Sequence, residues 1–184
     1  MAAKSNLVNM VLSLTIVCLV CSGLLGGIYA MTAGRIAEVQ EAKTKASIAR
    51  VLPPFEGQPE SLEAESDGKP YQCYRVEGTG LAVVSTVVGF GGPLTLMVGF
   101  DEAGSVVNTV VLSHSETPGL GAKCTSEVSF IDQFKGWDPA ARRLAVRKDG
   151  GEVDAITAST ITSRAYALAV ENAYKVYLNL SGNE

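Results

Sequence analysis

The chain has 184 residues, with 19 acidic and 15 basic side chains and a formal net charge of −4. Because this balance is acidic and no basic patch is interleaved with aromatic residues, we expect no nucleic-acid partner. His114 is the only histidine and the four cysteines lack cluster-ligand spacing, so we expect no metal site.

The amino-terminal segment predicts a membrane anchor. No charged residue lies between Lys4 and Arg35, and residues 7–28 are almost wholly apolar, which is long enough for a helix to cross a hydrocarbon core. A cleaved signal peptide is the competing interpretation, but its apolar region would be shorter and a clear small-residue cleavage site would follow. We therefore predict a single retained transmembrane helix within residues 1–32.

The basic residues around this anchor bear on its orientation. Lys4 precedes the apolar segment, whereas four basic residues follow soon after it, namely Arg35, Lys43, Lys45 and Arg50. The positive-inside rule taken alone would place the carboxyl-terminal side in the cytoplasm.

Residues 33–70 are predicted to be a juxtamembrane helix and a linker. The Ala, Glu, Lys and Arg content of residues 33–52 favours a helix that continues from the anchor and stops at Pro53-Pro54. Residues 55–70 are rich in Pro, Gly, Glu, Asp and Ser, which is typical of an exposed loop.

Residues 71–184 predict one α+β domain with an antiparallel sheet and flanking helices. We expect strands at 71–76, 81–90, 94–100 and 106–113, a hairpin joining 144–148 to 152–156, and a closing helix over 160–180. Cys73 and Cys124 lie in this domain, either as a disulfide or as two buried thiols.

Two short motifs in this domain have the composition of a binding site. Residues 116–121 read ETPGLG, in which Pro118 fixes a turn while Gly119 and Gly121 leave room for a flat ring to approach the backbone. Residues 157–160 read TAST at the start of the closing helix. Thr160 would thus meet the unpaired N–H groups of a helix amino terminus, which favour a phosphate.

These two motifs, in this order, resemble the FMN-binding domain shared by the G subunit of Rnf electron-transport complexes and the C subunit of sodium-pumping NADH:quinone reductase. The resemblance covers residues 75–178 and includes the glycine-rich run at residues 89–94. In that family the flavin is esterified through its phosphate to the last threonine of an Asp-x-x-(Ser/Thr)-Gly-Ala-Thr run.

The resemblance implies one covalent FMN, a set of cofactor-binding residues and no catalytic residue of the chain's own. Thr160 matches the esterified threonine, and Ala158 and Ser159 replace the family's Gly-Ala. Arg164 would add a cation near the phosphate, and Lys123 would stabilise negative charge on the reduced ring. The remaining cofactor-binding residues that the resemblance implies are Asp154, Thr157, Glu116, Thr117, Gly119 and Leu120.

The family implies an electron-transfer subunit of a complex that couples electron flow between ferredoxin and NAD to Na⁺ or H⁺ translocation. It also implies partner subunits, a flavin transferase, and an FMN domain on the extracytoplasmic side of the inner membrane. No dinucleotide-binding Gly-x-Gly-x-x-Gly follows a strand, so no independent substrate site is expected. Alternatives are the C subunit of the quinone reductase, a regulatory FMN-domain protein, or a flavin-free, membrane-tethered assembly or binding domain.

Overall fold

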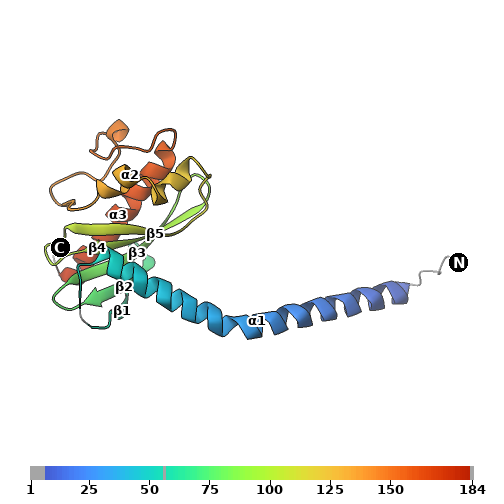
Figure 1. Cartoon of the computed structure of the whole chain (residues 1–184). Helices are drawn as coiled ribbons and strands as arrows, with labels where there is room; N and C mark the ends of the chain where they lie inside the picture. Colours follow the sequence, from blue (N-terminus) through green and yellow to red (C-terminus); the bar gives the residue numbers. More distant parts are fainter. Residues whose placement is uncertain (1–6, 56, 183–184) are drawn as a thin grey trace. The chain divides into compact units, whose positions relative to one another are not determined.

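The computed structural model describes residues 7–55 and 57–182, which fall into two units divided between Thr44 and Lys45. Helix α1 (Leu7–Val51) begins the described chain (Figure 1). Its most apolar 18-residue window has a mean hydropathy of 2.3, so the helix is long and apolar enough to cross a membrane. The predicted anchor helix and the helix expected up to Pro53 therefore form one continuous element.

The second unit contains a five-stranded antiparallel sheet in which neighbours along the chain are neighbours in space. This order needs only short reversals, such as the Asp101–Gly104 turn, where Gly104 has a φ of +85°. The strands are β1 (Glu60–Ser66), β2 (Lys69–Val76), β3 (Gly80–Val88), β4 (Pro93–Phe100) and β5 (Val106–His114).

Helix α3 (Thr160–Ser181) covers one face of this sheet and forms the main core with it. Ala165, Ala169 and Ala173 recur every four residues, and these small side chains let the helix approach the strands closely. The buried Tyr166 hydroxyl bonds to Thr109 Oγ1 on β5 at 2.7 Å. Packing and this hydrogen bond together fix the start of α3 relative to the sheet.

The carboxyl-terminal end of α1 packs on the opposite face of the sheet. Ile48, Val51 and Leu52 form a second apolar cluster with Val76 and Met97. The backbone of Val51 approaches β4 so closely that a Cβ at Gly99 would overlap its carbonyl group. Both sheet faces of the second unit are thereby covered.

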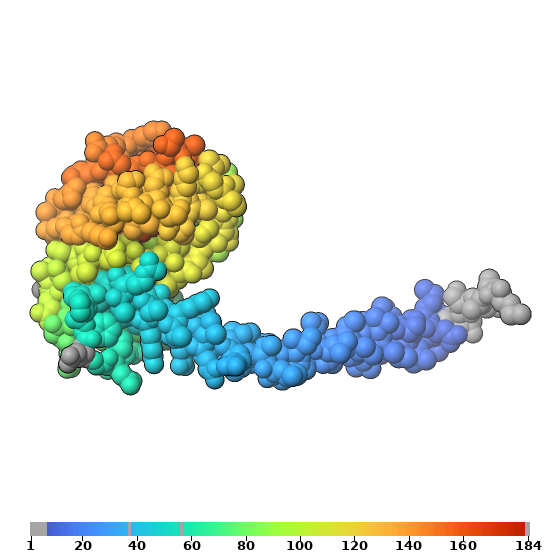
Figure 2. All heavy atoms as spheres, in the orientation of Figure 1, coloured from blue at the N-terminus to red at the C-terminus, as the bar shows by residue number. Residues whose placement is uncertain are grey.

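The segment between β5 and α3 contains three short helices and long connections. They are η1 (Gly121–Thr125), α2 (Val128–Asp132) and η2 (Arg147–Asp149). In the space-filling view the part that follows β5, coloured yellow to light orange, covers the upper part of the near side of this unit (Figure 2). The buried side chains of Phe130, Phe134 and Trp137 join it to the main core.

Two predictions about local structure were wrong. Within the expected loop over residues 55–70, Glu60–Ser66 forms β1 and Lys69 already begins β2, because Leu62 and Ala64 pack against the core. The outward-facing glutamates of β1 suit a sheet edge, which is also why its composition resembles that of a loop.

The hairpin predicted within residues 144–156 is absent from the described chain. Val146 and Val153 instead form a single parallel bridge, and the 3₁₀ turn η2 lies between them. Gly150, with a φ of +79°, ends this turn, and Gly151 lies against the Ala145 carbonyl, where a Cβ would overlap it. The chain therefore curls back in the same direction instead of reversing.

Candidate functional site

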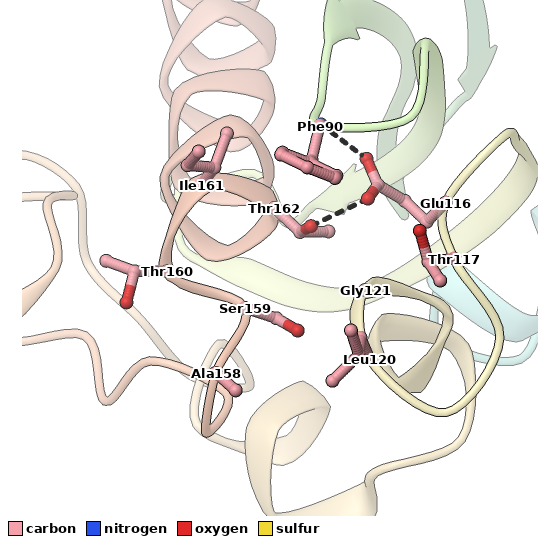
Figure 3. A pocket seen from close by; sticks show the side chains of 10 residues that line it. All are labelled: Phe90, Glu116, Thr117, Leu120, Gly121, Ala158, Ser159, Thr160, Ile161 and Thr162. Atoms are coloured by element: carbon pink, nitrogen blue, oxygen red, sulfur yellow. Dashed lines mark hydrogen bonds between the residues drawn. The ribbon is translucent and has the colours of Figure 1, made fainter.

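A cavity of about 320 Å³ lies between the amino-terminal end of α3, the β3–β4 turn and the turn that follows β5 (Figure 3). Both sequence motifs contribute to its walls, although they are some forty residues apart in the chain. Its ten lining residues are Phe90, Glu116, Thr117, Leu120, Gly121, Ala158, Ser159, Thr160, Ile161 and Thr162.

The α3 wall is built by an irregular turn just before the helix. Ala158 adopts a φ of +60°, the left-handed conformation that disfavours residues with a Cβ. The buried Ser163 hydroxyl locks this turn, because it donates to the Ser159 carbonyl at 3.0 Å and accepts from the Ile156 N–H at 2.9 Å. The entry into the helix is thus held rigidly.

Thr160 is the first residue of α3, and its side chain is half-buried. The N–H groups of a first helical turn have no partner within the helix, and here no side-chain cap from the described residues bonds them. They carry the positive end of the helix dipole. The Thr160 hydroxyl therefore lies where a phosphate would be stabilised.

The Glu116 carboxylate joins the three walls of the cavity. It is only 5% exposed, and its Oε1 accepts from the Phe90 N–H at 2.8 Å and from the Gly91 N–H at 3.4 Å. Its Oε2 accepts from the Thr162 hydroxyl at 2.8 Å (Figure 3). Glu116 thus ties the β3–β4 turn to the first turn of α3, and its negative charge faces the positive end of the helix.

Two glycines leave the space that this carboxylate occupies. A Cβ at Gly89 would overlap Glu116 Oε1, and a Cβ at Gly121 would overlap Glu116 Oε2 and approach Thr162 Oγ1. Glycine is needed at both positions because the carboxylate approaches the backbone directly.

The turn after β5 forms the third wall. The Leu120 N–H donates to the Thr117 carbonyl at 3.2 Å, and Gly119 between them has a φ of +76°, as the Pro-Gly sequence predicts. Leu120 leaves 44% of its surface exposed, and Phe90 leaves 67% exposed. With the half-exposed Ile161 they give the cavity an apolar rim.

Six of the predicted cofactor-binding residues line this cavity: Thr160, Ala158, Ser159, Glu116, Thr117 and Leu120. Five do not, namely Asp154, Thr157, Gly119, Lys123 and Arg164. Two of the five are engaged in exposed ion pairs: Asp154 pairs with Arg147, and Arg164 donates two hydrogen bonds to Asp149 at 2.6 and 2.8 Å. This bond to Arg164 lowers the pKa of Asp149.

Four of the lining residues are not among the predicted cofactor-binding residues: Phe90, Gly121, Ile161 and Thr162. Of these, only Gly121 was expected to leave room for the flat ring. Gly121 lies inside the ETPGLG motif, and Phe90 lies inside the glycine-rich run at residues 89–94. The signal that could have identified Phe90 is the glycine on either side of it. Thr162 carries no signal of its own, because only the fold places it opposite Glu116.

Comparison with known proteins shows the family. The family described as FMN-binding domain matches residues 89–175, a range that contains every lining residue, and the RnfG N-terminal region matches residues 1–51. The chain is 32% identical over 170 residues to the G subunit of the ion-translocating oxidoreductase complex of Yersinia pestis, which covers 83% of this chain and 81% of that protein. The chain belongs to the family of G subunits of ion-translocating oxidoreductase complexes. The resemblance given by the two motifs is thereby confirmed.

Another relative is similar to this chain over nearly its full length. The protein of the same name from Vibrio cholerae serotype O1 is 32% identical over 185 residues, which covers 91% of this chain and 88% of the relative. Among solved structures, the C subunit of the Na⁺-translocating NADH-quinone reductase of Parabacteroides distasonis matches with a TM-score of 0.51 at 20% identity. That match covers 79% of this chain and 84% of the other, and it shows a shared fold.

The cavity has the features that an FMN group requires. Cofactor sites are typically lined by apolar groups with a few convergent polar ones, over roughly 300 Å³ or more. Here Phe90, Leu120 and Ile161 would meet the flat ring, and the first turn of α3 would meet the phosphate. Bound FMN would supply one- and two-electron redox chemistry.

Proposed function

We propose that this chain carries one FMN as a phosphoester on Thr160 and transfers electrons within an ion-translocating oxidoreductase complex. The observation that carries the proposal is the position of Thr160, which is the first residue of α3 and lies in the wall of the cavity. A monoanionic phosphodiester there would gain from the unpaired N–H groups of the first turn. Family membership supports the same cofactor.

Attachment needs help from outside the chain. Threonine is a weak nucleophile, and no described side chain forms a hydrogen bond with Thr160 Oγ1 that would take its proton. A flavin transferase would therefore activate the hydroxyl. In a balanced reaction, Thr160 Oγ1 bonds to the flavin phosphorus, a phosphoanhydride of a flavin dinucleotide breaks, and the nucleoside monophosphate leaves as the threonine proton is lost.

In this proposal the anchor helix and the flavin domain have separate roles. Helix α1 would hold the chain in the inner membrane as a single-pass protein, with the flavin domain on the extracytoplasmic side where the transferase acts. Partner subunits would deliver and accept the electrons, between ferredoxin and NAD overall, and couple them to Na⁺ or H⁺ movement. The chain itself would contribute no substrate site, only a redox group held in place.

The test is in-gel flavin fluorescence of the denatured full chain after co-expression with a flavin transferase, with intact mass as confirmation. Thr160→Ala should lose the fluorescent band, and Thr160→Ser should keep it because a hydroxyl remains. Thr79→Ala, at a half-buried threonine in the β2–β3 turn, is the matched control and should label fully. A Thr160→Ala protein that keeps its flavin through denaturation would show that the site is wrong. An unlabelled wild type that has met active transferase would favour a flavin-free assembly domain.

A further inference from the structure

The Ser159 hydroxyl is a buried polar group without a partner. The residue is 6% exposed, and its Oγ forms no hydrogen bond with any residue that the structure describes. An unpaired buried hydroxyl destabilises a folded domain, so most such groups in proteins are satisfied. The neighbouring hydroxyls of Thr162 and Ser163 follow that rule, because both are bonded.

This hydroxyl is directed into the cavity. Ser159 lines the cavity, and its side chain extends from the chain just before α3 toward Leu120 and Gly121 on the opposite wall (Figure 3). Thr160 lies on the other side of the same chain segment. Leu120 is exposed and apolar, so it can shift aside but cannot accept a hydrogen bond.

No described group in the cavity wall accepts a hydrogen bond from this hydroxyl. Glu116 lines the same cavity, but its two oxygens accept from the Phe90 and Gly91 N–H groups and from the Thr162 hydroxyl. The backbone of Ser159 is also bonded, since its N–H donates to Ile156 and its carbonyl accepts from Ser163. Of the hydrogen-bonding groups of Ser159, only the hydroxyl has no partner among the described residues.

We infer that the Ser159 hydroxyl is completed by the cofactor: it donates a hydrogen bond to a polar atom of the flavin beyond its phosphate, in the ribityl chain or the ring. This inference rests on the proposed function, and it adds a second, noncovalent attachment on the side of the chain opposite Thr160. Ser159 is therefore a binding residue whose effect depends on whether flavin is present. The unloaded domain bears an unpaired group that the loaded domain does not.

The structure offers a matched control. Ser85, in the central strand β3, is the other described residue with a buried and unpaired side-chain oxygen, and it is fully buried. It does not line the cavity. Replacing Ser85 by alanine removes the same kind of group at a position where flavin cannot satisfy it.

The experiment measures the Tm of the full chain in detergent, expressed with or without a flavin transferase, for wild type, Ser159→Ala and Ser85→Ala. Flavin attachment should raise the Tm of wild type and of Ser85→Ala by the same amount. In Ser159→Ala the rise should be smaller by about 3–6 °C, the shift expected for one hydrogen bond in a domain of this size. A changed flavin absorption spectrum in Ser159→Ala would place the bond on the ring, and an unchanged one on the ribityl chain.

The outcomes separate this inference from the proposed function. If wild type carries covalent FMN but Ser159→Ala gains as many degrees from it as Ser85→Ala, the Ser159 inference is wrong and the proposed function stands. If wild type carries no FMN after exposure to an active transferase, both are wrong.

Discussion

Glu116 allows the sharpest test of how the cavity is held together. Glu116→Ala removes the acceptor for the Phe90 N–H and for the Thr162 hydroxyl, whose residue is 1% exposed. Leaving a buried donor unsatisfied costs about 1–3 kcal/mol, so we expect the free energy of unfolding to fall by about 2–4 kcal/mol. For a domain of this size that corresponds to a Tm lower by about 8–15 °C.

Glu116→Gln distinguishes hydrogen bonding from charge. Its amide oxygen can still accept from the Phe90 N–H, and its amide nitrogen can donate to the Thr162 hydroxyl, which accepts as readily as it donates. The free energy of unfolding should therefore fall by only about 1 kcal/mol, which is the difference between a charged and a neutral hydrogen-bond acceptor.

The assay is urea unfolding of the flavin-free chain, followed by circular dichroism, with Glu65→Ala as the control. Glu65 is exposed on the edge strand β1, so this control should change stability by less than about 0.5 kcal/mol. If Glu116→Ala is as harmless as Glu65→Ala, Glu116 does not hold the cavity walls together. Equal losses in the alanine and glutamine variants would mean that charge, not hydrogen bonding, holds the walls.

Two further predictions concern backbone strain and the thiols. Because Ala158 has a φ of +60°, Ala158→Gly should relieve about 1 kcal/mol of strain, partly offset by the greater freedom of glycine when unfolded. Urea unfolding should show a net gain of about 0.5 kcal/mol, and a loss would contradict this account. Burial raises the pKa of both Cys73 and Cys124 to about 11. In a variant that carries Cys18→Ser and Cys21→Ser, the two remaining thiols should resist alkylation at pH 8 until urea is added. Thiols of the unfolded chain ionise near pH 9.0, before those of the folded chain, so the free energy of unfolding should fall as the pH rises from about 9 to 11. Rapid alkylation of the folded protein would contradict the burial of these thiols.

The sequence alone determined the elements whose signal is local. An uncharged apolar run predicts α1 because its length matches a membrane, and alternating apolar residues predict β2 to β5. The Ser and Thr residues around position 160 and the apolar periodicity behind them predict α3, and the Pro-Gly turn predicts the positive φ at Gly119. The two motifs also identified the family, because their order and composition together are specific.

Only the tertiary structure decided what depends on partners far along the chain. The segment of β1 has the composition of a loop, but it forms a strand because Leu62 and Ala64 pack against the main core. In the same way, Arg164 was expected at the phosphate but bonds Asp149, fifteen residues earlier in the chain. Glu116 and Thr162 are 46 residues apart, and their hydrogen bond exists because α3 packs across the sheet. Ser159 remains unpaired for the same reason: the fold buries its hydroxyl beside a cavity, where no described side chain satisfies it.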